Sequence, residues 1–71
     1  METTVKSELQ GFVDIFGLGI TKEKLASKAY FYMENNGHEC YTINGKYICI
    51  DGEEFQFIKS RATDKWIVKE L

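Results

Sequence analysis

Two dipeptides, Asn44-Gly45 and Asp51-Gly52, divide the stretch from Cys40 to Lys59 into short runs of alternating apolar residues. Type I′ turns need positive φ at both central residues, and Asn-Gly and Asp-Gly adopt that conformation at little cost. Such turns join neighbouring antiparallel strands. The stretch therefore predicts an antiparallel β-meander, and a fourth strand is expected over about residues 65–70, with its facing left open.

Two amphipathic helices are expected before the meander. The first covers residues 4–16 with Thr3 or Thr4 as its N-cap, and the second covers about 22–35 between Thr21 and the stop signal Asn35-Asn36-Gly37. Their apolar sides, read from helical spacing, are Val5, Leu9, Phe12, Val13 and Phe16, and then Leu25, Ala26, Ala29, Tyr32 and Met33. The chain is thus expected to form one α+β domain over residues 1–71, with two N-terminal helices packed on a three- to four-stranded antiparallel β-meander.

The turns also predict a strand register. A two-residue loop at Asn44-Gly45 sets Ile43 opposite Lys46, Tyr41 opposite Ile48, and Cys40 opposite Cys49. The second loop is either Asp51-Gly52 or Gly52-Glu53, and both choices keep the same faces because they differ by two residues. The expected buried face consists of Tyr41, Ile43, Ile48, Ile50, Phe55 and Phe57.

The same register places four side chains with ligand chemistry on the opposite face: His38, Cys40, Cys49 and Asp51. An imidazole, two thiolates and a carboxylate can form a tetrahedral zinc site, and two cysteines on paired strands can form a disulfide. The spacing is not typical of zinc sites, and cytosolic thiols are normally reduced. We expect two free thiols, no metal and no cofactor.

Charge and hydropathy narrow the classes of partner. The 71 residues carry a net charge of −2, which does not favour binding to phosphate backbones. The N-terminus lacks the features of a signal peptide, and no apolar run approaches the roughly 18 residues of a membrane span. A cytoplasmic protein without a membrane segment is expected.

Catalytic motifs are not evident. His38 has no nucleophile beside it in any recognisable motif, so we expect neither an enzyme nor a small-molecule pocket. Residues 25–61 somewhat resemble the core of restriction-endonuclease-like nucleases, which carry a Glu-x-Lys element on the third strand. Phe57 stands where that glutamate would be, so the resemblance does not extend to the metal-binding carboxylates.

The remaining hypothesis is a small non-enzymatic protein-interaction module, such as a regulator or inhibitor of the type that phages and other mobile elements encode. A protein partner or a homodimer would then cover apolar residues outside the core. Tyr47 and Ile58 on the outer side of the sheet are the favoured contacts, because a Gly52-Glu53 turn would make them neighbours. Phe31 is the second candidate, although we expect it to pack beneath the first helix.

The alternative is a nucleic-acid-binding module. Aromatic side chains flanked by cations on a sheet can hold single strands. The residues for this role are Lys46, Lys59, Arg61, Lys65 and Trp66, but acidic residues alternate with them along the chain.

Overall fold

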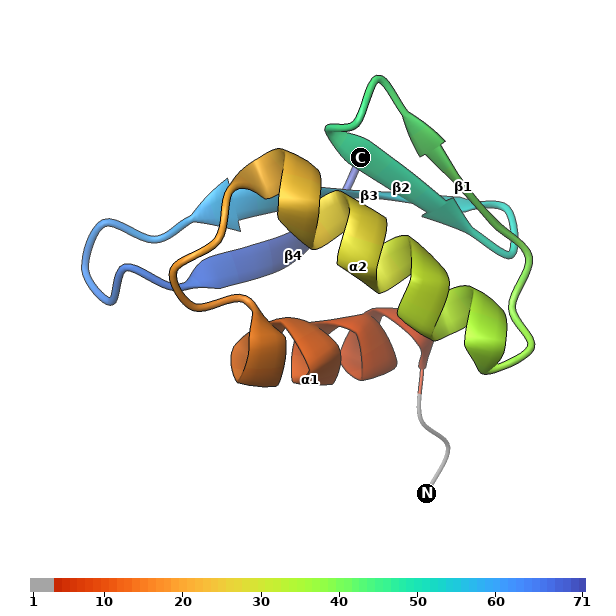
Figure 1. Ribbon diagram of the computed structural model, residues 1–71, viewed down its shortest axis with the longest axis horizontal. Coiled ribbons are helices and arrows are strands. Elements are labelled where there is room, and N and C mark those ends of the chain that lie inside the picture. The colour runs from red at the N-terminus through yellow and green to blue at the C-terminus, as the bar shows by residue number, and fades with distance from the viewer. Residues whose placement is uncertain (1–3) are drawn as a thin grey trace.

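The computed structural model describes residues 4–71 as two helices followed by four strands (Figure 1). The strands form an antiparallel meander in the order β1-β2-β3-β4, so β1 and β4 are its edges. The predicted α+β class is confirmed, with four strands rather than three. The elements are α1 (Val5–Phe16), α2 (Lys22–Asn35), β1 (Cys40–Ile43), β2 (Tyr47–Ile50), β3 (Glu53–Lys59) and β4 (Trp66–Glu70).

Local hydrogen bonds set the helix ends where the sequence predicts them. The Thr4 hydroxyl accepts the Ser7 amide at 3.0 Å, and the Thr21 hydroxyl accepts the Lys24 amide at 3.3 Å. At the end of α2, Gly37 has φ +90°, and the His38 amide donates to the Met33 carbonyl at 3.1 Å. This Schellman motif stops α2 and turns the chain toward β1.

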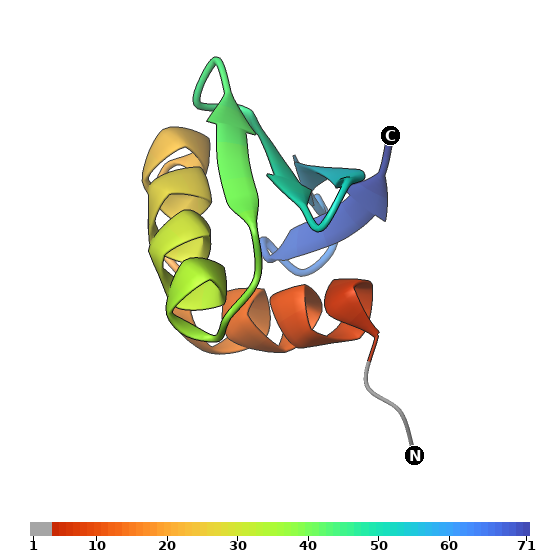
Figure 2. The ribbon, with the colours of Figure 1, turned by 90° about the vertical axis from the view of Figure 1, so that its right-hand side faces the viewer.

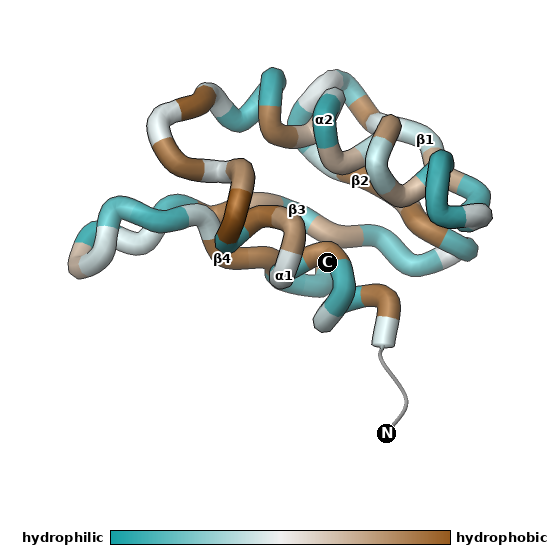
Figure 3. Tube along the Cα trace, turned by 60° about the horizontal axis from the view of Figure 1, so that its bottom comes forward, coloured by the Kyte–Doolittle hydropathy of each residue, from teal (hydrophilic) through white to brown (hydrophobic). Residues whose placement is uncertain are grey.

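Both helices pack on the same face of the sheet (Figures 1 and 2). Helix α1 lies against β4, while α2 lies against β1 and β2. Figure 3 shows apolar residues along the helices and central strands, whereas the turn between β3 and β4 is mostly hydrophilic. The buried cluster consists of Leu9, Phe12, Val13, Leu25, Ala26, Ala29, Met33, Ile48, Ile50, Phe55, Phe57 and Val68.

The second hairpin has one of its two predicted forms. Asp51 and Gly52 occupy the loop with φ of 51° and 87°, and Ile50 lies opposite Glu53. This register confirms the four central members of the predicted buried face, which are Ile48, Ile50, Phe55 and Phe57.

The first hairpin differs from the prediction by one residue. Asn44 and Gly45 have the expected positive φ of 54° and 66°, but strand pairing resumes only with Ile43 opposite Tyr47. Lys46 is thus an additional loop residue, and a one-residue slip exchanges the faces of a strand.

The slip makes the predictions for β1 wrong. Tyr41 pairs with Cys49 instead of Ile48, and Cys40 pairs with Ile50 instead of Cys49. Tyr41 and Ile43 therefore lie on the face away from the helices, and Tyr41 is 56% exposed.

The apolar stripe of α1 is narrower than helical spacing suggests. Leu9, Phe12 and Val13 are buried, but Phe16 is 55% exposed, although its ring lies 5.0 Å from that of Phe12. The reason is that α1 meets the sheet at a single edge strand, β4. Tyr32 of α2 likewise remains partly exposed and stacks on Phe12 at 4.6 Å.

Candidate functional site

In the part of the chain that the structure describes, no helix covers the face of the sheet opposite α1 and α2 (Figure 2). Strand pairing places Tyr41, Ile43, Tyr47, Ile58 and Ile67 on it, and we call this set the outer sheet face. Ile58 and Ile67 lie opposite each other and are 38% and 41% exposed. Tyr47 and Ile43 are half-buried.

The predicted residues Tyr47 and Ile58 both lie on this outer sheet face, but they are not the neighbours we expected. The loop is Asp51-Gly52 rather than Gly52-Glu53, so Tyr47 lies opposite Gln56. The direct apolar neighbour of Ile58 is Ile67. The sequence signal for Ile67 was the apolar triplet 66–68, since a strand cannot bury three consecutive side chains on one face.

Phe31 is 63% exposed, so the expectation that α1 covers it is wrong. Helix α1 meets α2 through the Phe12–Tyr32 stack, and Phe31 lies on another side of α2. There its ring contacts Tyr30 edge-on, with centroids 5.3 Å apart.

A shallow groove of about 170 Å³ lies beside Phe31, between α2 and the β1–β2 hairpin. Its volume is below the range of roughly 300–1,000 Å³ usual for small-molecule sites, and it suits a single side chain. The lining residues are Glu23, Ser27, Tyr30, Phe31, Thr42 and Gly45.

The residues of the nucleic-acid alternative do not form one stripe. The Lys59 ammonium lies 3.3 Å from Asp64 and 5.5 Å from the centroid of the Trp66 ring. The Trp66 indole donates to the Ile20 carbonyl at 3.2 Å and packs against the core, so its ring lies on the helix side of the sheet. Lys46 lies in the first turn and Arg61 and Lys65 lie near the β3–β4 turn, and Figure 1 shows these turns apart.

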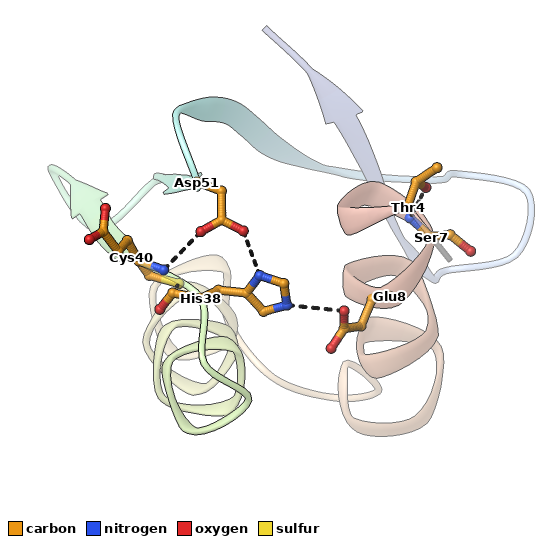
Figure 4. Close-up of polar contacts among 7 residues, drawn as sticks. Thr4, Ser7, Glu8, His38, Cys40 and Asp51 are labelled. Atoms are coloured by element: carbon orange, nitrogen blue, oxygen red, sulfur yellow. Dashed lines mark hydrogen bonds and ion pairs between the residues drawn. The ribbon is translucent and has the colours of Figure 1, made fainter. Parts of the chain in front are cut away.

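His38 bridges two carboxylates (Figure 4). Its Nδ1 lies 2.6 Å from Asp51 Oδ2, and its Nε2 lies 3.2 Å from Glu8 Oε2. Asp51 Oδ1 also accepts the Glu39 amide at 2.9 Å. The Asp51 hydrogen bond raises the pKa of His38, and the His38 and Glu39 contacts lower the pKa of Asp51. The cluster fastens α1 and the β2–β3 turn to the segment that enters β1.

The four-residue ligand set expected around His38 does not converge. Because of the register slip, Cys40 lies on the helix side and Cys49 lies on the outer side, so the prediction of one shared face is wrong. Burial raises the pKa of Cys40 to about 11, which keeps its thiol protonated at neutral pH. Within residues 4–71, no group of three or more His, Cys, Asp or Glu side chains is arranged to hold a metal ion.

Comparison with known proteins assigns no family. No protein-family model matches the chain, and no curated protein or solved structure matches it either. Neither α1 nor α2 is long and apolar enough to cross a membrane.

Proposed function

We propose that this protein acts by binding another protein rather than by catalysis. The observation that carries the proposal is the one-sided sheet, in which both helices lie on one face and the other keeps exposed Tyr41, Ile58 and Ile67. Ile58 and Ile67 form an exposed apolar pair on this face, apolar patches of this kind mark interaction sites, and aromatic side chains such as Tyr41 commonly contribute much of the binding energy. Occupying a partner's surface in this way suits a regulator or inhibitor.

Nucleic acid is the less favoured partner. The net charge is −2, and Trp66, the aromatic residue of that alternative, is engaged with the Ile20 carbonyl and the core. Counterion release needs several cations on one surface, and the basic residues of this alternative are divided between the first turn, with Lys46, and the β3–β4 end of the sheet.

The test is site-specific photo-crosslinking of the full chain in its native cells. Benzoylphenylalanine replaces Phe31 or Ile58, and the control places it at Lys6, which is exposed on α1, away from both positions. We expect one defined polypeptide adduct from position 31 or 58, and none from position 6. Alanine at the reactive position should weaken binding of that polypeptide by about 30-fold, which corresponds to a hot-spot loss of about 2 kcal/mol.

Two results would contradict the proposal. One is equal labelling from all three positions, which would mean random collision. The other is an adduct to nucleic acid that disappears in the variant Arg61→Ala.

A further inference from the structure

The two edge strands of the sheet, β1 and β4, differ in whether a side chain covers their outward backbone groups. Exposed strand edges present unpaired amides and carbonyls to other chains, and proteins usually cover or disrupt them. At β4, the side chain of Gln10 from α1 does this. Its Oε1 accepts the Val68 amide at 2.8 Å, and its Nε2 donates to the Trp66 carbonyl at 3.3 Å.

Within the described residues, no side chain covers the β1 edge in this way. The Asp51 amide donates to the Glu39 carbonyl at 2.8 Å, which continues the β1–β2 ladder by one pair. Because antiparallel pairing alternates, Tyr41 and Ile43 direct their amides and carbonyls toward β2, while Cys40 and Thr42 direct theirs outward. In residues 4–71, no hydrogen-bond partner is found for the backbone groups of Cys40 and Thr42.

Apolar side chains flank this open edge on both faces of the sheet. Thr42 is part of the groove that Tyr30 and Phe31 line on the helix side. Tyr41 is exposed on the outer side. A strand added beside β1 would alternate its side chains between these two surfaces.

We propose that β1 is a docking edge for an extended segment of a partner protein, which adds a fifth strand to the sheet. The inference rests on the proposed protein-binding function and specifies its mode. Alternate backbone groups of the segment pair with Cys40 and Thr42. One apolar side chain of the segment enters the groove beside Phe31.

The charges around the groove indicate which segment fits. Glu23 lines the groove, and no lysine or arginine does. The carboxylate of Glu34 lies beside the Tyr30 hydroxyl, where it raises the pKa of Tyr30. An apolar residue with lysine or arginine two positions away matches this pattern, because residues two apart in a strand share a face. Pairing of β1 with β1 of a second copy would instead bring two acidic grooves together.

The experiment is a selection from a display library of random 12-residue peptides, with the full chain immobilised as the target. Selected peptides should carry the apolar and basic pattern and bind as extended strands. In the complex with the unmodified protein, the amides of Cys40 and Thr42 should become protected from hydrogen exchange. In an added strand, every second peptide amide pairs with β1 and the others face solvent. Methylation of the pairing amides should abolish binding, whereas methylation of the solvent-facing amides should leave it unchanged.

Variants locate the site. Phe31→Ala should weaken binding by about 30-fold. Thr42→Pro removes the outward amide but no bond to β2, and should also weaken binding. Ile15→Ala is the control, because Ile15 is apolar and exposed but lies on α1, which packs against β4 at the opposite edge, and it should bind normally.

Three outcomes would overturn the inference. Selected peptides that depend on Ile58 and Ile67 and leave Thr42 unprotected would place binding on the outer sheet face, and the proposed function would stand. If the protein associates with itself and Thr42→Pro abolishes this association, then β1 pairs with a second copy of the chain and not with a partner segment. If the chain enriches no peptide and crosslinks to no protein, both the docking edge at β1 and the proposed protein-binding function are wrong.

Discussion

His38 connects three separate segments of the chain. It contacts Glu8 near the start of α1 and Asp51 in the second turn, and it follows the Schellman motif that ends α2. Both ring nitrogens face carboxylates, and this arrangement favours the imidazolium form. The cluster is therefore a pH-dependent fastening between the helical layer and the sheet.

Titration by NMR should give His38 a pKa above its ordinary value of 6.5. Because the pKa of His38 is raised in the folded state, the stabilisation that protonated His38 provides is complete below its unfolded pKa. This stabilisation is lost as pH rises through its folded pKa. Asp51 has a lowered pKa, so its contribution is lost as pH falls through that value. The ion pair of His38 and Asp51 therefore stabilises the fold at pH values between the folded pKa of Asp51 and the folded pKa of His38.

Asp51→Asn should bring the His38 pKa down toward 6.5, and its effect on melting temperature should shrink as pH rises above the folded pKa of His38. Glu8→Gln is the matched comparison and should shift the pKa less, because the Glu8 contact is longer, at 3.2 Å against 2.6 Å. A His38 pKa at or below 6.5 in the unmodified protein would contradict this account.

Two isoleucines on neighbouring parts of the sheet test which face is buried. Ile48 is fully buried under α2, so Ile48→Ala should cost roughly 2–5 kcal/mol in the free energy of unfolding. Ile67→Ala removes the same atoms from the outer sheet face and should cost less than half as much. Chemical denaturation measures both, and equal losses would be inconsistent with a one-sided sheet.

At the scale of elements, α1 has a second task besides burying its apolar stripe, because Gln10 closes the edge of β4. Gln10→Ala would leave the Val68 amide and the Trp66 carbonyl without a partner. We expect a loss of about 0.5–1.5 kcal/mol, the usual net contribution of a hydrogen bond, because both contacts are only partly buried. Hydrogen exchange at the Val68 amide should accelerate.

Gln10→Glu is the conservative control, since a carboxylate still accepts the Val68 amide but cannot donate to Trp66. Exchange at Val68 should therefore be slower in Gln10→Glu than in Gln10→Ala, whereas stability should still fall, because the new carboxylate lies against Asp14 and the Trp66 carbonyl. Unchanged exchange at Val68 in Gln10→Ala would show that the side chain does not cover the edge.

The sequence predicted those elements whose ends are set by hydrogen bonds and turns among neighbouring residues. The caps Thr4 and Thr21 and the loop Asp51-Gly52 act over three or four residues; both helices were predicted correctly, and the second hairpin has one of the two loops that the sequence left open. In the first hairpin, Asn44 and Gly45 have the predicted φ, but the additional residue Lys46 shifts the register and reverses the faces of β1.

The candidate site was less predictable because it depends on contacts between distant segments. Phe31 is exposed because α1 packs on a different side of α2, and no periodicity within α2 indicates where another helix will lie. The Gln10 contact with Val68 joins residues 58 positions apart. Only the folded chain shows that one sheet edge is closed and the other is open.

The molecule as a whole combines a balanced charge with a sheet that is covered on one face. Binding of single-stranded oligonucleotides at physiological salt should therefore be weaker than about 100 μM, the weak end of non-specific binding. Fluorescence anisotropy over a salt series checks this. Micromolar affinity with a steep salt dependence that Lys59→Ala or Arg61→Ala reduces would favour the nucleic-acid alternative instead.

The most direct test of an open docking edge is residue-resolved amide hydrogen exchange of the free protein. We predict that the Thr42 amide exchanges at close to its unprotected rate. The amides of Tyr41 and Ile43, which face β2, and of Val68, which Gln10 covers, should exchange far more slowly. Protection of Thr42 equal to that of Val68 would mean that the β1 edge is already occupied, and would contradict the account.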